Sequence, residues 1–276
     1  MKYVNLHAHS LSIGDSIGFP GEHIDYAIEN GLEAHAFTDH GTMSALSYAF
    51  LHQKKLKEKG KDFKIIHGVE AYFVPSLENW DIQYELSKLQ KKQKKSEVDD
   101  EESSVVIEDE EETKSSAQSS VDEFNPNRRA HIVLLAQNAV GLKNIFKMVS
   151  LSYQKGNFYR FPRIDLKMLR EHNEGVIVST ACLGSSLTSF TGFFDETKTK
   201  GQVFDEQLKL VNTFKKIFGD RFFLELQWNA IPIQMKFNQQ LIELAEKTDT
   251  KLISTADCHY PRPELWKERE IYKAIA

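Results

Sequence analysis

The stretch YVNLHAH at residues 3–9 is a short β-rich run that ends in two histidines, His7 and His9. In an extended strand, residues i and i+2 point to the same side, so the two imidazoles face one point. Two imidazoles placed in this way can hold one ion of zinc or manganese. The run therefore predicts a strand that delivers a pair of metal ligands at its end.

Further β-rich runs alternate with helix-like segments along the rest of the chain. Strands that alternate with helices indicate a mostly parallel sheet. Seven strands without a glycine-rich dinucleotide motif favour a barrel over an open sheet, so an α/β barrel is the expected fold class. The runs cover residues 3–7, 34–38, 64–69, 131–136, 175–180, 222–227 and 251–255. The helix-like segments cover residues 24–29, 44–59, 140–152, 204–218 and 233–248.

Side chains of metal-ligand types end five of these seven runs, and at the C-terminal ends of barrel strands they would converge on one rim. Asp257 and His259 repeat the spacing of the first run, and a carboxylate such as Glu70 can bridge two cations. Clusters of two metals suit phosphoester hydrolysis, because they lower the pKa of a bound water and stabilise the attacking and leaving oxygens. The candidates are His7 and His9 with Asp15 in the following loop, Asp39 and His40, Glu70, Cys182, and Asp257 with His259.

The net charge of −5 comes from one stretch of the chain. Residues 91–123 hold five lysines and twelve acids, a formal charge of −7, so the remainder carries +2. The acidity is therefore no argument against a polyanionic substrate. Residues 88–127 are poor in aromatics and rich in Glu and Ser, which predicts a disordered or loosely helical acidic insertion. It is either a solvated loop or an acidic segment that binds a basic partner.

The remaining composition narrows the class of protein. No apolar run approaches the ~18 residues that a membrane span requires, and no secretory signal begins the chain, so a cytoplasmic protein is expected. Cys182 and Cys258 are too few for a disulfide framework and are expected to be reduced thiols or metal ligands. With the insertion set aside, residues 1–276 have the length of a single barrel domain.

Several motifs together resemble the polymerase and histidinol phosphatase (PHP) domain. More narrowly, residues 1–87 and 124–276 are similar to the N-terminal PHP domain of the bacterial DNA polymerase III alpha subunit. The Cys182 motif and FYRFPRID at residues 158–165 are typical of the polymerase type. The motifs are HAH (7–9), FTDHG (37–41), GVEAY (68–72), HIVLLA (131–136), PRI (162–164), TACLG (180–184) and ADCHY (256–260).

The resemblance implies the α/β fold of a (β/α)7 distorted TIM-like barrel, with a metal cluster at the C-terminal strand ends. The cluster would hold two or three divalent metal ions, zinc, manganese or iron. His7, His9, Glu70 and Asp257 would hold the first metal and activate water as the catalytic group. The second metal would be held by Glu70, His131 and Cys182, and the third by Asp15, His40 and His259. His131 opens its strand, so reasoning from strand ends alone would have missed it. Arg163 and Arg128 are candidate contacts to substrate phosphate.

The implied function is a metal-dependent phosphoesterase in DNA replication, a 3′–5′ exonuclease that proofreads primer ends. Its expected partners are DNA and the remainder of a polymerase or other replisome subunits, with no membrane. Two alternatives stay open: a metal-stabilised scaffold without catalysis, and a free-standing phosphatase similar to histidinol phosphatases. The parent family is a DNA-directed DNA polymerase, a nucleotidyltransferase. Its polymerase site is not expected in these 276 residues, which would be a fragment, a truncated gene or half of a split polymerase.

Overall fold

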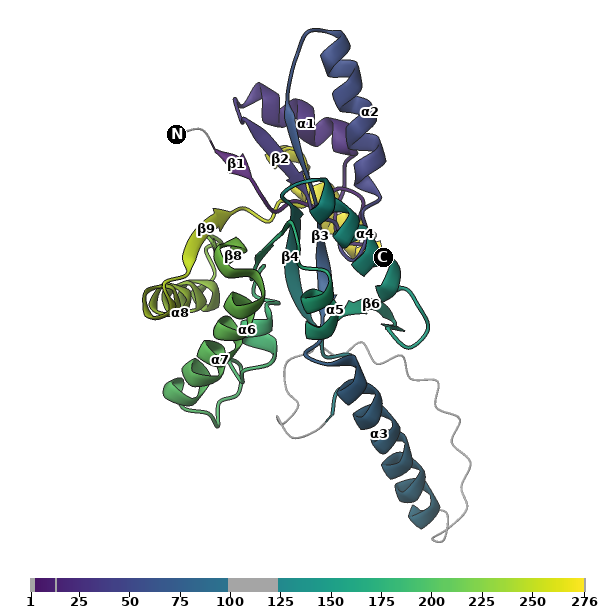
Figure 1. Cartoon of the computed structure of the whole chain (residues 1–276). Helices are drawn as coiled ribbons and strands as arrows, with labels where there is room; N and C mark the ends of the chain where they lie inside the picture. Colours follow the sequence, from purple (N-terminus) through teal and green to yellow (C-terminus); the bar gives the residue numbers. More distant parts are fainter. Residues whose placement is uncertain (1–2, 13, 99–123, 276) are drawn as a thin grey trace.

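Seven strands form a nearly closed, barrel-like sheet in the computed structural model, which describes residues 3–12, 14–98 and 124–275 (Figure 1). Their order around the sheet is β1 (Val4–Asn5), β2 (Ala34–Phe37), β3 (Lys64–Phe73), β4 (Ala130–Ala136), β7 (Val176–Ser179), β8 (Phe222–Gln227) and β9 (Lys251–Thr255). A parallel bridge between Ala8 and Cys258 brings the two ends of this order together, just beyond β1 and β9. The barrel class expected from the alternating pattern is confirmed.

Strand β4 departs from the expected parallel arrangement. It runs antiparallel to both of its neighbours, with Val133 paired to Glu70 of β3 and to Ser179 of β7. The start of β4 therefore lies at the rim where the neighbouring strands end. This direction brings His131, the second residue of β4, to the same rim as the residues that follow the other strands. Strand β3 continues to Phe73, so Glu70, which was expected at the end of the strand, lies inside it, and β4 contributes His131 from its opposite end.

The five segments expected to be helical all form helices. They are α1 (Pro20–Glu29), α2 (Ala45–Glu58), α4 (Ala139–Ser152), α7 (Lys200–Phe218) and α8 (Pro232–Thr248). Local signals set their ends: Thr199 and Gln202 form a capping box at the start of α7, and α8 ends where Asp249 adopts a left-handed conformation. The structure adds α3 (Leu77–Val98), β5 (Phe158–Tyr159), β6 (Phe161–Ile164), α5 (Leu166–Glu171), α6 (Ser186–Ser189), η1 (Gly219–Arg221), η2 (Pro263–Leu265) and α9 (Trp266–Ile275).

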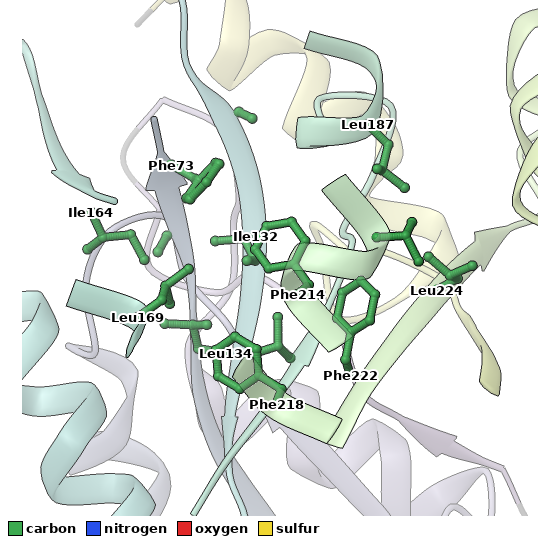
Figure 2. Close-up of a cluster of buried hydrophobic side chains, with 14 of the residues drawn as sticks. Phe73, Ile132, Leu134, Ile164, Leu169, Leu187, Phe214, Phe218, Phe222 and Leu224 are labelled. Carbon is green, nitrogen blue, oxygen red and sulfur yellow. The ribbon is translucent and has the colours of Figure 1, made fainter. Parts of the chain in front are cut away.

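The main hydrophobic core lies between the sheet and the helices that cover its outer face (Figure 2). Along β4, Ile132 and Leu134 point into this core, whereas Val133 and Leu135 belong to a smaller cluster with Ala36. The alternation follows from the two-residue period of a strand. The chain thus packs most of its apolar core on the outer face of the sheet, while the inner face carries a smaller apolar cluster together with the polar groups at the rim.

Helix α3 projects away from the sheet and reaches into the segment that was expected to be an acidic insertion (Figure 1). Residues 88–98 continue this helix, because the stretch is rich in Lys and Gln, which are good helix formers. Of the two states predicted for the insertion, disordered or loosely helical, residues 88–98 therefore adopt the helical one. Residues 124–127 form a turn before β4, and residues 99–123 lie outside the described residues. Within the described part of the chain, no helix is long and apolar enough to cross a bilayer.

Candidate metal centre

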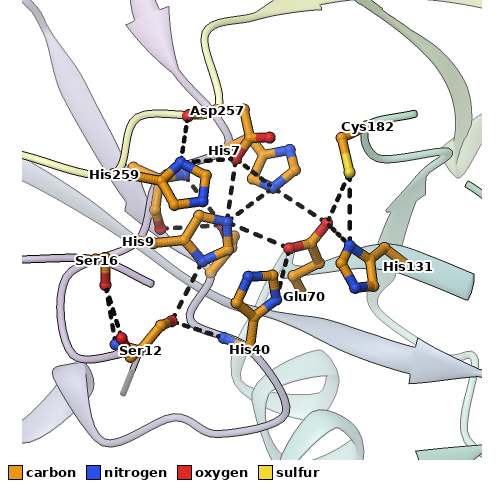
Figure 3. A network of polar contacts seen from close by, with 12 residues as sticks. His7, His9, Ser12, Ser16, His40, Glu70, His131, Cys182, Asp257 and His259 are labelled. Carbon is orange, nitrogen blue, oxygen red and sulfur yellow. Dashed lines mark hydrogen bonds and ion pairs between the residues drawn. The ribbon is translucent and has the colours of Figure 1, made fainter. Parts of the chain in front are cut away.

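The two histidines after β1 point to one place, as their spacing predicts (Figure 3). His7 Nε2 lies 3.2 Å from His9 Nε2, and both side chains are fully buried. Asp257 faces them across the closure of the barrel, with Oδ1 3.3 Å from His7 Nε2 and 3.1 Å from His9 Nε2. Its φ of 49° is left-handed, a conformation that Asp tolerates better than most residues. The three groups form a set that could hold one metal ion.

Glu70 occupies the centre of the cluster. One carboxylate oxygen, Oε1, lies 3.5 Å from His7 Nε2, 3.2 Å from His131 Nδ1 and 3.9 Å from Cys182 Sγ. The other, Oε2, lies 3.2 Å from His9 Nε2 and 2.9 Å from His40 Nδ1. The side chain is only 1% exposed, so each oxygen faces protein groups and not solvent. This arrangement suits a carboxylate that bridges cations.

Cys182 and His131 form one side of the cluster, with Sγ 3.5 Å from Nδ1. The backbone N–H of Gly184 donates to the same sulfur at 3.4 Å. A Cβ at Gly184 would come within 3.2 Å of the His131 ring, so a glycine is what allows the loop after β7 to pass this close. Thiolate and imidazole are ligands that favour zinc.

Asp15 joins two further histidines on the opposite side. Its Oδ2 lies 2.9 Å from His40 Nε2 and 2.9 Å from His259 Nε2. The ring of His259 is fixed by its Nδ1, which donates to the carbonyl of Asp257 at 2.8 Å. The Asp15 carboxylate is therefore close enough to His40 and His259 to share a cation with them.

All nine predicted ligand positions therefore lie in one connected cluster. Eight of them were expected from the strand ends and the loop after the first strand, and His131 was expected from the resemblance alone. Their contacts come from β3, from the start of β4, and from the loops after β1, β2, β7 and β9. The positions are His7, His9, Asp15, His40, Glu70, His131, Cys182, Asp257 and His259.

Buried polar groups behind the cluster fix the orientation of its imidazoles. Glu225, in the interior of the barrel, accepts a hydrogen bond from His7 Nδ1 at 2.6 Å and another from Thr255 Oγ1 at 2.5 Å. The Ser179 hydroxyl also donates to Glu225. Because Nδ1 is the donor, the lone pair of His7 Nε2 is left to face the cluster. Glu225 thus orients the imidazole of His7.

Asp39 supports the cluster indirectly, through the loop that follows β1. Its carboxylate accepts from the backbone N–H groups of Ser10, at 2.6 Å, and Leu11, at 3.0 Å. It also accepts from Ser12 Oγ, which lies 3.4 Å from His9 Nδ1. Asp39 thereby fixes the loop that carries His9. Ser12 and Thr255 were missed in the sequence, because a single hydroxyl residue carries no pattern that separates this role from any other.

The charges in the cluster depend on one another. Burial opposes the charge of His7, but Asp257, Glu225 and Glu70 outweigh it and hold the pKa of His7 well above its usual value. Burial is likewise outweighed at His40, where Glu70 and Asp15 raise the pKa to about 10. The histidines in turn keep the pKa of Glu70 well below its usual range despite its burial. Without metal, protons on the imidazoles supply the positive charge that these carboxylates require.

The donor set fits divalent cations better than it fits protons. His40 Nδ1, Glu70 Oε2 and Asp257 Oδ1 are buried and make no hydrogen bond, although each lies within an ion pair of the cluster. A buried polar atom without a hydrogen-bond partner is costly, so these atoms call for another ligand. Imidazole, carboxylate and thiolate together match the preferences of zinc, manganese and iron.

The predicted phosphate contacts are not brought to the cluster. Arg163 is 2% exposed; its guanidinium donates to the carbonyls of Asn157, at 2.9 Å, and Gly156, at 3.1 Å, and stacks 3.8 Å over the Trp80 ring. These contacts explain why Arg163 supports the loop before β5 instead. Arg128 lines a separate hollow of about 320 Å³ with Trp80 and Phe124.

Comparisons with known proteins show which proteins the chain is similar to. The family model described as "PHP domain" matches residues 5–229. The chain is 35% identical over 263 residues to the DNA polymerase III subunit alpha of Aquifex aeolicus, which covers 95% of this chain and 18% of that protein. It is 30% identical over 250 residues to the Helicobacter pylori subunit, covering 90% of this chain and 17% of that protein. The chain thus spans about a fifth of the length of these curated relatives.

A solved structure with a similar outline is a histidinol phosphate phosphatase from Lactococcus lactis, complexed with zinc, L-histidinol and phosphate. It aligns with a TM-score of 0.41 at 16% identity, covering 99% of this chain and 91% of that chain.

Proposed function

Because the chain belongs to the PHP domain family, we propose that it is a metal-dependent phosphoesterase that acts on the 3′ ends of DNA. The observation that carries the proposal is the position of Glu70, whose two oxygens lie between four imidazoles and the sulfur of Cys182. A site with several cations held around one carboxylate is suited to phosphoryl chemistry.

Three sets of residues would hold the cations. His7, His9, Glu70 and Asp257 form the first, Glu70, His131 and Cys182 the second, and Asp15, His40 and His259 the third. Divalent cations held there would supply Lewis acidity towards phosphoryl oxygens and would lower the pKa of water. Zinc, manganese and iron all suit these ligands.

The residues of the chain would prepare this site before a substrate arrives. Glu225 keeps the His7 ring in one tautomer, and the carbonyl of Asp257 does the same for His259. Both rings therefore turn Nε2 inward. Such hydrogen bonds lower the cost of organising ligands around a cation. His7, His9 and Glu70 are almost fully buried, whereas Asp15 and His131 are partly exposed and give solvent contact with the cluster.

The substrate and the partners of the proposal come from the relatives. The curated proteins that match are alpha subunits of DNA polymerase III. We infer that this domain is part of such a replicative polymerase, and that its cluster removes nucleotides from a primer in the 3′–5′ direction as a proofreading exonuclease. DNA and other replisome subunits would then be its partners, and the cytoplasm its compartment.

The activity is tested with the purified chain, Mn²⁺ or Zn²⁺, and a primer labelled near its mismatched 3′ end. We expect wild type to shorten the primer and His9→Ala to lose at least about tenfold in rate, because a ligand imidazole is missing. His52→Ala is the matched control, since His52 pairs with Asp25 at 2.8 Å outside the cluster. Equal rates for wild type and His9→Ala, or no cleavage by wild type, would rule out the proposal.

A scaffold role is the main competing function, and the structure offers one observation in its favour. The nine positions come from six separate segments, so bound cations would tie the barrel together without any catalysis. In that case chelation lowers the melting temperature while no phosphoester is cleaved. A phosphatase on small esters would instead release phosphate from monoesters and leave the primer intact.

A further inference from the structure

Helix α9 forms hydrogen bonds with the loop that carries Asp15. Arg269, in α9, donates from Nε to the backbone carbonyl of Asp15 at 2.8 Å and from Nη2 to its carboxylate oxygen Oδ1 at 2.8 Å. Three residues further on, Tyr272 accepts a hydrogen bond at its hydroxyl from the backbone N–H of Gly14 at 3.0 Å. The two contacts hold consecutive residues of one turn.

The two oxygens of the Asp15 carboxylate have different partners. Oδ1 is taken by the guanidinium, whereas Oδ2 faces His40 Nε2 and His259 Nε2, each at 2.9 Å. The side chains of Arg269 and Asp15 are 18% and 29% exposed, so this ion pair is partly shielded from solvent. A charge-assisted contact of this kind fixes the plane of the carboxylate. One oxygen is thereby presented to the cluster.

Apart from these contacts, helix α9 packs little of its surface against the rest of the described structure. Arg269 and Tyr272 are its two half-buried residues, and the other residues of the helix are exposed. Just before the helix, Arg262 pairs with Glu29 at 3.1 Å, on the surface and away from Asp15. The position of α9 therefore depends largely on its hold on residues 14 and 15.

We propose that Arg269 is a positioning residue for Asp15, and that occupancy of the Asp15–His40–His259 site is coupled to the docking of α9. The inference rests on the proposed metal cluster and adds a means of regulating it. A cation at this site favours the Asp15 orientation that Arg269 also favours. By linkage, docking of α9 raises the affinity of this site for metal, and metal at this site stabilises docked α9 by the same factor.

The proposed coupling concerns one of the three metal sites, the one that contains Asp15. Among the described residues, the sets around His7 and around Cys182 form no hydrogen bond or ion pair with α9, and their support comes from Glu225 and Gly184 instead. Loss of a residue that orients a ligand costs about 10- to 100-fold in metal affinity. A change at Arg269 should therefore weaken one site and leave the other two as they are.

The test is a Co²⁺ titration of the full chain as wild type, Arg269→Gln, Arg269→Lys and Arg262→Gln. Bound metal is counted after equilibrium dialysis, and absorbance from the Cys182 thiolate to Co²⁺ reports the second site separately. The matched control is Arg262→Gln, which removes an arginine and an ion pair next to the same helix. Hydrogen exchange of residues 266–275 with and without Co²⁺ reports the docking of α9.

We expect Arg269→Gln to bind one ion fewer at Co²⁺ concentrations that fill wild type, or to need about 10- to 100-fold more metal for that ion. The thiolate absorbance stays unchanged, Arg269→Lys recovers part of the loss, and Arg262→Gln behaves as wild type. Co²⁺ slows exchange in α9 of wild type and not of Arg269→Gln.

Three results would overturn the inference. Identical binding by wild type and Arg269→Gln removes the role of Arg269 and leaves the metal cluster standing. Loss of all sites together in Arg269→Gln, with a lower melting temperature of the metal-free protein, means that the residue is merely structural. A wild type that binds no Co²⁺ and shows no thiolate absorbance removes both this inference and the proposed function.

Discussion

At the scale of single residues, the spacing of His7 and His9 was the most informative signal in the sequence. It predicted two imidazoles on one side of a strand, and their Nε2 atoms lie 3.2 Å apart. Asp257 and His259 also reach the cluster, but from the loop after β9, where Asp257 has a left-handed φ of 49° and not an extended conformation. Arg269 carried no such signal, because a contact between residues 15 and 269 depends on how the last helix folds back.

His40 makes a prediction about pH that needs no substrate. Its pKa in the folded, metal-free protein is about 10, against 6.5 for the ordinary group, because Glu70 and Asp15 outweigh its burial. A raised pKa contributes stability that is fully present below pH 6.5 and is lost as the pH rises towards 10. We therefore expect the free energy of unfolding of the metal-free chain to fall over this range, as measured by urea denaturation.

The same titration in the presence of Zn²⁺ should reverse the sign. Metal binds deprotonated imidazoles, so its stabilising effect grows as protons leave the cluster. In metal-free His40→Gln we expect a shallower fall with pH than in wild type. A metal-free wild type whose stability is flat or rises between pH 6.5 and 10 would contradict the assignment of charge.

At the scale of elements, sequence periodicity located the seven barrel strands and five long helices. It did not show the direction of β4, because an apolar run such as HIVLLA reads the same in parallel and antiparallel pairing. Direction is decided by the connections and by the neighbouring strands. The antiparallel β4 is what places His131 at the rim, and only the resemblance to the family had indicated that residue.

The packing of α7 on the sheet gives a prediction for an element that holds no ligand. Phe214 is 1% exposed, and its ring lies 5.7 Å from that of Phe73 and 5.2 Å from that of Phe222. We expect Phe214→Ala to lower the free energy of unfolding by about 3–5 kcal/mol, since the core cannot close around the cavity.

Exposed Phe194 provides the control for that experiment, because it is 59% exposed. Phe194→Ala should change stability by less than about 1 kcal/mol. The metal content of folded Phe214→Ala should equal that of wild type, as the side chain lies on the outer face of the sheet. A loss below about 1 kcal/mol for Phe214→Ala would mean that α7 does not pack as described.

At the scale of the whole molecule, the barrel brings residues from 7 to 259 to one rim. The net charge of the chain is a poor guide to whether this site can take a polyanionic substrate, since the acidic stretch at residues 91–123 dominates the total. The closure between Ala8 and Cys258 could be expected once the fold was known to be a barrel. The support from Ser12, Ser179 and Thr255 could not, because each contributes one hydroxyl from a different segment.

The position of bound metal is the most direct test of the central claim. Crystals of the chain soaked in Mn²⁺ or Zn²⁺ should show anomalous scattering peaks inside the cluster of nine residues, with at least two of them in contact with the Glu70 carboxylate. The corresponding Glu70→Gln crystals should show weaker peaks, because the bridging charge is gone. Metal bound only elsewhere on the surface, or peaks that are unchanged in Glu70→Gln, would contradict the account.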